Sequence, residues 1–150
     1  SGTAYAGNYI GPANVRFTGA GGSAVETFTA VVNVAQNSQI SVNFLEVGND
    51  GTQCTQVDPV YLNGSSFSYT DNYVCDVPNL GRCNITESGR GGINGDRMTV
   101  SVSGTASCPP GSLAMTINYS GTKQTVGGAS FQAASTSGQG IASMMKQAVK

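Results

Sequence analysis

The side chains that could carry acid–base chemistry in this sequence are its carboxylates, because histidine is absent. Without an imidazole, neither a Ser-His-Asp triad nor a Cys-His pair can form. Most of the eight acidic residues fall in predicted turns or at strand ends, where aspartate commonly bonds its own backbone. Glu46 and Glu87 are the exceptions, since each continues the inward alternation of a predicted strand. Such a pair could act as general acid and base, but two solvated carboxylates at a barrel mouth explain it better. We therefore predict no catalytic residue.

Metal binding receives little support from the residue spacing. The turns at 49–51 and 94–96 are rich in oxygen and could hold Ca²⁺, but they lack the alternating acidic residues of an EF-hand loop. Hairpin turns account for both segments. The four cysteines contain no C-x-x-C pair of the kind that zinc sites use. The sequence thus predicts no metal site and no cofactor.

The four cysteines are instead predicted to form disulfides, which favours an oxidising compartment. A four-residue hairpin loop before residue 97 places Cys83 directly opposite Cys108, and the preceding hairpin places Cys54 diagonal to Cys75. Opposed Cβ atoms lie at a separation that a disulfide can bridge. We predict Cys54–Cys75 and Cys83–Cys108; the rival pairing is Cys75–Cys83 with Cys54–Cys108. A redox role is not predicted, because no basic neighbourhood surrounds any of the cysteines.

The elements that position these residues are predicted mainly from period-two alternation. It is clearest over 97–122, where Met98, Val100 and Val102 share one face and hydroxyl side chains occupy the other. That segment is predicted to be a hairpin with one buried face. Earlier strands are predicted at 8–18, 27–35, 39–47, 54–62 and 65–75, with a weaker strand at 83–87 whose neighbouring glycines loosen the pattern.

The C-terminal segment has a different periodicity. Residues Ile141, Met144, Met145 and Val149 fall on one stripe of a short helix, which is too short to be stable alone. We expect this stripe to pack on its own domain, with docking on a partner subunit or membrane surface as the alternative. Residues 1–126 are predicted to form a disulfide-stapled antiparallel β domain, and 127–150 a flexible Gly/Ser-rich linker followed by the helix.

About eight strands in sequential hairpins predict an all-β fold, an antiparallel up-and-down β-barrel with a short C-terminal amphipathic helix. A β-sandwich is the alternative, because strand counting does not separate the two. The opening Gly7-x-Tyr9 and the trailing helix resemble the layout of lipocalin and calycin barrels. Those families usually carry a tryptophan after the opening glycine and this chain has none, so the resemblance implies the layout alone.

A ligand cavity is the most specific site that the sequence suggests. Small residues on the presumed inward face leave room, and an eight-stranded barrel can hold one small ligand. The competing explanation is that glycines mark bends in coiled strands and aromatic rings fill the space. The aromatic residues predicted to line such a cavity are Tyr9, Phe17, Phe28, Phe44, Phe67, Tyr69 and Tyr119.

Composition narrows the function. Charged residues make up 10% of the chain and the net charge is −1, which argues against nucleic-acid binding. No apolar run approaches the length of a membrane span. We predict a secreted, periplasmic or surface-attached, non-catalytic β-barrel that binds a small apolar ligand or a protein partner. The alternatives are a structural subunit of an extracellular assembly, with homo-oligomers formed through the C-terminal tail, and, less favoured, an enzyme using buried carboxylates.

Overall fold

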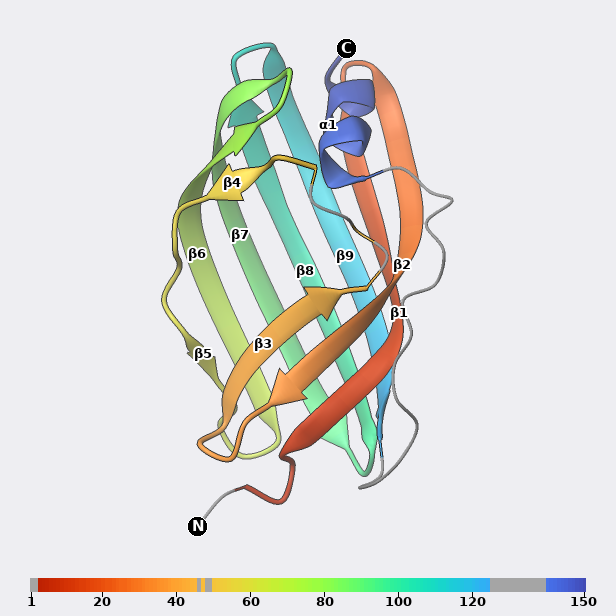
Figure 1. Ribbon diagram of the computed structural model, residues 1–150, viewed down its shortest axis with the longest axis vertical. Helices are drawn as coiled ribbons and strands as arrows, with labels where there is room; N and C mark the ends of the chain where they lie inside the picture. Colours follow the sequence, from red (N-terminus) through yellow and green to blue (C-terminus); the bar gives the residue numbers. More distant parts are fainter. Residues whose placement is uncertain (1–2, 46, 48–49, 125–139) are drawn as a thin grey trace.

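The computed structural model describes residues 3–45, 47, 50–124 and 140–150. They form one antiparallel nine-stranded sheet, strongly curled into an open half-barrel, and one helix (Figure 1). The strand order across the sheet is β4-β6-β7-β8-β9-β1-β2-β3-β5. In chain order the elements are β1 (Gly7–Gly19), β2 (Gly22–Val34), β3 (Gln39–Phe44), β4 (Gln53–Cys54), β5 (Val60–Tyr61), β6 (Ser66–Val77), β7 (Gly81–Asn94), β8 (Arg97–Cys108), β9 (Gly111–Lys123) and α1 (Ile141–Val149).

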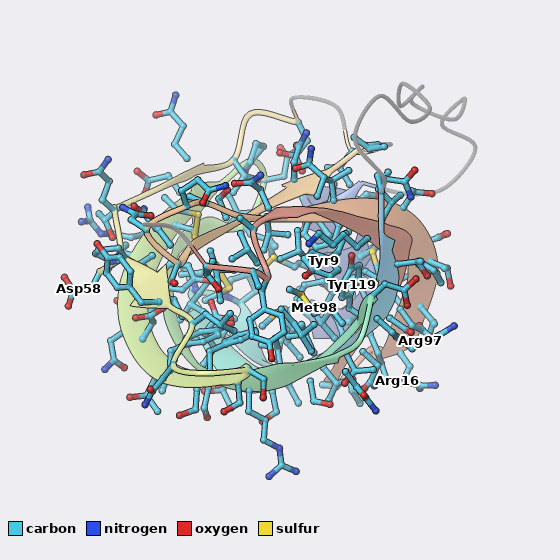
Figure 2. The ribbon with its side chains drawn as sticks, turned by 90° about the horizontal axis from the view of Figure 1, so that it is seen from below. Tyr9, Arg16, Asp58, Arg97, Met98 and Tyr119 are labelled. Atoms are coloured by element: carbon cyan, nitrogen blue, oxygen red, sulfur yellow. A yellow bond between two sulfur atoms is a disulfide. The ribbon has the colours of Figure 1, made fainter. Side chains whose placement is uncertain are left out.

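The long hairpins follow the predicted alternation of apolar and polar side chains. The predicted register between β2 and β3 is confirmed, because Val32 lies opposite Val42. The same holds for β7 and β8, where Ile93 lies opposite Met98. Inward side chains of β2, β7 and β8 are buried or partly buried and most outward ones are exposed, whereas β3 is more open, with Val42 exposed. In Figure 2 the inward residues Tyr9, Met98 and Tyr119 lie inside the ring of strands, whereas Arg16 and Arg97 point outward.

The glycines that weakened the prediction for 83–87 lie inside a continuous 14-residue strand, β7. Gly91 pairs with Phe67 of β6, and a Cβ at Gly91 would lie 2.6 Å from the Phe67 ring. Tyr69 covers Gly89 in the same way, two residues further along. The aromatic ring of one strand thus occupies the space that the facing glycine leaves empty, which lets β7 continue through its glycines.

The predicted strand at 54–62 is wrong. This segment contains two short strands that pair with opposite edges of the sheet: β4 pairs with β6, and β5 pairs with β3. Val60 lies opposite Ile40, and the hairpin that would join the predicted strands 54–62 and 65–75 is reduced to a single bridge between Asn63 and Ser66. The segment 53–61 thus pairs with both sides of the half-barrel. The fold is one strongly curled sheet, and not the two packed sheets of the alternative β-sandwich.

The two disulfides of the structure are Cys54–Cys75 and Cys83–Cys108, the pairing that the sequence register favoured. The Cα atoms are 4.0 Å and 4.2 Å apart. The register differs from the prediction in one detail, because Cys54 lies directly opposite Cys75 rather than diagonal to it. Disulfides persist in oxidising compartments, so they point to an environment outside the cytoplasm.

The helix α1 closes one end of the half-barrel, where it contacts β1, β2 and β9 (Figure 1). Its apolar stripe is buried there: Met144 and Met145 are 0% and 3% exposed. The fit is close, because Gly21 donates its amide hydrogen to the carbonyl oxygen of Ala148 at 2.9 Å. A Cβ at Gly21 would lie 2.8 Å from the carbonyl oxygen of Gln147, so glycine permits this approach.

The first turn of α1 is capped by a distant residue. Gly140 at the N-cap has no side chain, and the Ala142 amide donates instead to Oδ2 of Asp50 at 3.0 Å. The other carboxylate oxygen, Oδ1, accepts a hydrogen bond from the Thr52 amide. Burial works to raise the pKa of Asp50, but these hydrogen bonds outweigh it and hold the pKa below its usual value.

Candidate functional site

A cavity of about 390 Å³ lies inside the half-barrel, between two clusters of packed core residues. One cluster lies beneath α1 and includes Phe28 and Leu113; the other surrounds Tyr9 and Met98. Walls of the cavity come from β1, β2, β3, β6, β7, β8 and β9, so the curling of the sheet creates it. Most of the lining is apolar, and Ala13 and Ala30 contribute little volume on the β1–β2 side.

The mouth of this cavity is apolar as well. Val42 of β3 and Val57, in the segment between β4 and β5, line the cavity and are 57% and 46% exposed. Pairing between β3 and β5 ends at Ile40, so the two strands are not joined beside Val42. Isolated exposed valines are common on protein surfaces. Here the two exposed valines also line an apolar cavity.

One wall of the cavity carries a hydrogen-bonded cluster of polar side chains. Tyr69 donates its hydroxyl to Oε2 of Glu87 at 3.3 Å, and Tyr73 donates to Oε1 of the same carboxylate. Burial, and then Glu87 through its charge and its hydrogen bonds, raise the pKa of both tyrosines well above the usual value, so the hydroxyls stay protonated. Period two along β6 and the β6–β7 register bring these three side chains together.

A second carboxylate faces the same space. Asp71 lies between the two tyrosines on the inward face of β6, directly opposite Glu87, and both residues line the cavity. The expectation that Asp71 occupies a turn or a strand end is therefore wrong. Opposed like charges are unfavourable in a sheet, and ionised carboxylates only accept hydrogen bonds. This wall is thus suited to a group that donates hydrogen bonds.

The structure separates the predicted lining residues into two groups. Four of the seven aromatic residues contact the cavity: Phe44, Phe67, Tyr69 and Tyr119. The other three are core residues that do not line it: Tyr9, Phe17 and Phe28. Aromatic rings fill the space over Gly89 and Gly91, whereas a hollow remains beside Ala13 and Ala30.

Tyr119 is held by the neighbouring strand. Its hydroxyl donates to the carbonyl oxygen of Tyr9 at 2.7 Å, and the Tyr9 hydroxyl donates to the carbonyl oxygen of Tyr5 at 2.7 Å. Burial raises the pKa of Tyr119. This chain of hydrogen bonds satisfies the polar ends of two buried rings, so Tyr119 presents mainly its ring to the cavity.

Sequence reasoning missed Tyr73 and Asp71, although both continue the alternation that identified Tyr69. Of the predicted acid pair, Glu46 lies outside the described residues, and Glu87 lies opposite a different carboxylate, Asp71. The residues singled out for partner docking, namely Ile141, Met144, Met145 and Val149, lie on α1, where the last three are buried against the sheet of the same chain.

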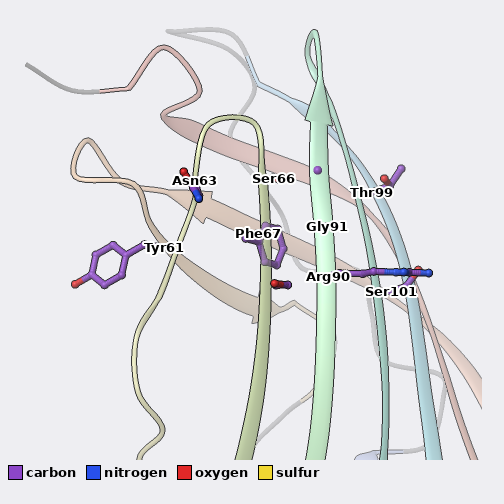
Figure 3. Close-up of a pocket in the computed structure, with 10 residues that line it drawn as sticks. Tyr61, Asn63, Ser66, Phe67, Arg90, Gly91, Thr99 and Ser101 are labelled. Carbon is purple, nitrogen blue, oxygen red and sulfur yellow. The ribbon is translucent and has the colours of Figure 1, made fainter.

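A second hollow lies on the outer face of β6, β7 and β8 (Figure 3). Its lining comes mainly from exposed polar side chains, including Ser66, Arg90, Thr99 and Ser101. The hollow is bounded by side chains that project from a continuous sheet, and it has no apolar wall comparable to that of the interior. The interior cavity is therefore the candidate site.

Within the described ranges, no three histidine, cysteine, aspartate or glutamate residues gather as metal ligands would. The part of the chain that the structure describes contains no helix with the length and apolar character needed to cross a bilayer. Comparisons of this chain with protein-family models, with curated proteins and with solved structures find no match.

Proposed function

We propose that this protein is a secreted, periplasmic or surface-attached binding module that holds a small, mainly apolar molecule inside its half-barrel, without catalysis. The observation that carries the proposal is the interior cavity of about 390 Å³ whose apolar lining continues to an opening flanked by Val42 and Val57. Ligand sites are commonly concave and mostly apolar, with a few placed polar groups. Here those polar groups are Asp71 and Glu87.

The polar wall specifies one end of the ligand. Asp71 and Glu87 accept hydrogen bonds, and the tyrosine hydroxyls beside them are already donated to Glu87. A ligand with an N–H or O–H group at one end and an apolar body would match both parts of the cavity. A ligand with a carboxylate at that end would meet two like charges.

The test uses N-phenyl-1-naphthylamine, a neutral apolar fluorophore with one N–H donor. Its fluorescence should rise on binding to the full chain and follow a saturable, one-site titration. Val42→Ser and Val57→Ser should each weaken binding by about three- to ten-fold, since each removes roughly 1 kcal/mol of apolar contact. Both residues are exposed, so the fold should tolerate the changes.

Val25→Ser is the matched control, because Val25 is 44% exposed and does not line the cavity. It should leave the dissociation constant of the probe unchanged. Equal effects of all three substitutions, or no saturable binding by the wild type, would reject the proposal. Native mass spectrometry of the purified protein would in addition reveal a molecule retained from the host.

A structural role in an extracellular assembly is the second candidate, and the edge at β3 favours it. Val42 and Tyr61, on β3 and β5, are 57% and 50% exposed beside strand edges that pair over two residues only. Exposed apolar edges are natural sites for strand addition by another chain. Light scattering at increasing concentration decides: a species that stays monomeric counts against assembly, and one that Val42→Ser disperses supports it.

A further inference from the structure

The four cysteines form a single row across four adjacent strands. Cys54 of β4 pairs with Cys75 of β6, and Cys75 pairs with Cys83 of β7 in the same register. Cys83 is in turn bonded to Cys108 of β8. Paired residues project to the same face of a sheet, so all four sulfur atoms lie on one side. Each disulfide therefore has a cysteine of the other disulfide as its direct neighbour.

The hydrogen-bond pattern explains why the disulfides join Cys54 to Cys75 and Cys83 to Cys108, rather than Cys75 to Cys83. The Thr55 amide donates to the carbonyl oxygen of Val74, which makes Cys54 and Cys75 a closely spaced, non-hydrogen-bonded pair. In an antiparallel sheet the next pair along the row, Cys75 and Cys83, is then the hydrogen-bonded type, with Cα atoms about 5.5 Å apart. That separation also falls within the range that a disulfide bridges.

The solvent exposure of the cysteines differs between the two ends of the row. Cys54 lies on the edge strand and is exposed, whereas Cys75, Cys83 and Cys108 are 3%, 0% and 7% exposed. Cys54 is therefore the one cysteine of the row at which we expect an external thiol to react. The rival pairing of Cys54 with Cys108 is excluded in the folded chain, because three strand spacings separate them by about 14 Å.

We propose that this row is a thiol–disulfide exchange relay that carries a reaction at exposed Cys54 to buried Cys108. A low-molecular-weight thiolate attacks the Cys54 sulfur, forms a mixed disulfide there, and leaves the electron pair on Cys75. The Cys75 thiolate then attacks Cys83, so that a Cys75–Cys83 bond forms, the Cys83–Cys108 bond breaks, and Cys108 leaves as a thiolate that takes a proton from water. Two disulfides and one thiol are present before and after, so the exchange is balanced.

The geometry of the row favours the second step. Cys75, Cys83 and Cys108 lie on three adjacent strands, β6, β7 and β8, so Cys75 is on the side of Cys83 opposite Cys108. The sheet holds the reactants adjacent, which replaces a bimolecular collision by an intramolecular step. A sequence motif does not mark this arrangement, because strand register, not chain spacing, brings the cysteines together.

The proposal is tested by two variants that remove the same disulfide. Cys54→Ser leaves a thiol at Cys75, next to Cys83, whereas Cys75→Ser leaves it at Cys54, two strands or about 10 Å from Cys83. After incubation at pH 8.5 and alkylation, peptide mapping should show Cys108 labelled at least ten-fold more in Cys54→Ser than in Cys75→Ser. Equal labelling of Cys108 in the two variants, whether both low or both high, would overturn the relay.

The wild type provides a test that does not depend on the variants. Incubation with reduced glutathione should produce molecules that carry glutathione on Cys54 and an alkylated Cys108, with Cys75 joined to Cys83. At pH 5 this product should fall at least ten-fold, because the attacking thiols are protonated. A product with glutathione on Cys54 and the free thiol remaining at Cys75 would show that the reaction stops at the first disulfide.

Discussion

Replacing Met144 by alanine should release α1 from the end of the half-barrel. The Met144 side chain is 0% exposed, and truncation of a buried methionine removes about 2–5 kcal/mol of packing. A nine-residue helix does not persist alone in water, so the docking against the sheet must stabilise it. The lost packing energy therefore weakens the docking of α1 on the sheet first, and the sheet with its two disulfides should remain folded.

Hydrogen exchange gives the most direct measurement. The Gly21 amide donates to the carbonyl oxygen of Ala148, so its protection reports docking from the side of the sheet. Met144→Ala should lower this protection by at least 30-fold, which corresponds to about 2 kcal/mol, while amides in β8 keep theirs. Lys146→Ala, at an exposed position of the same helix, is the control and should change protection less than three-fold. Unchanged protection at Gly21 in Met144→Ala would refute the reasoning.

Three further predictions concern other contacts. Asp50→Ala should destabilise α1 by about 1 kcal/mol, as loss of a helix cap does. Because the folded pKa of Asp50 is lowered, the stabilisation by Asp50 is present above about pH 4 and is lost as the pH falls through that folded pKa. An acid titration followed by hydrogen exchange would detect this loss. Tyr73→Phe should lower the free energy of unfolding, measured in urea, by about 1–2 kcal/mol, since Glu87 loses a hydrogen-bond donor. Because the folded pKa of Tyr73 is raised, the wild type should lose stability above about pH 10, and the variant should lose less. Gly91→Ala should lower the thermal midpoint by several degrees, because its Cβ would meet the Phe67 ring, and an unchanged midpoint would contradict that packing.

Much of the fold could be predicted from local pattern. Alternation located the long strands, and hairpin geometry gave the partner of Cys83. The segment around Cys54 could not be predicted in this way, because strands of two residues have no period to detect. The turn between β6 and β7 lies between the strands predicted at 65–75 and 83–87, as expected, where Pro78 and Asn79 are typical turn residues and Asn79 has a φ of 65°.

The candidate site was predicted less completely than the fold. Tyr69 was identified because aromatic residues on an inward face are expected in a barrel interior. Asp71 was grouped with the acidic residues of turns and strand ends, although its position in the alternation places it inside. The bond between Tyr73 and Glu87 depends on the register of β6 and β7, for which the sequence analysis made no prediction. Residue type and strand pairing thus had to be considered together.

Pairing of β1 with β9 sets the order in which the chain can assemble. The Tyr119 hydroxyl bonds the carbonyl oxygen of Tyr9 across 110 residues of sequence, and Ala13 lies opposite Tyr119. Contacts this distant carry a large loop-closure cost, whereas β6 to β9 are joined by short turns. The meander from β6 to β9 should therefore form first and the β1–β2 hairpin should join it last. During synthesis β1 and β2 are made first, but β1 can pair with β9 only after β9 has been made.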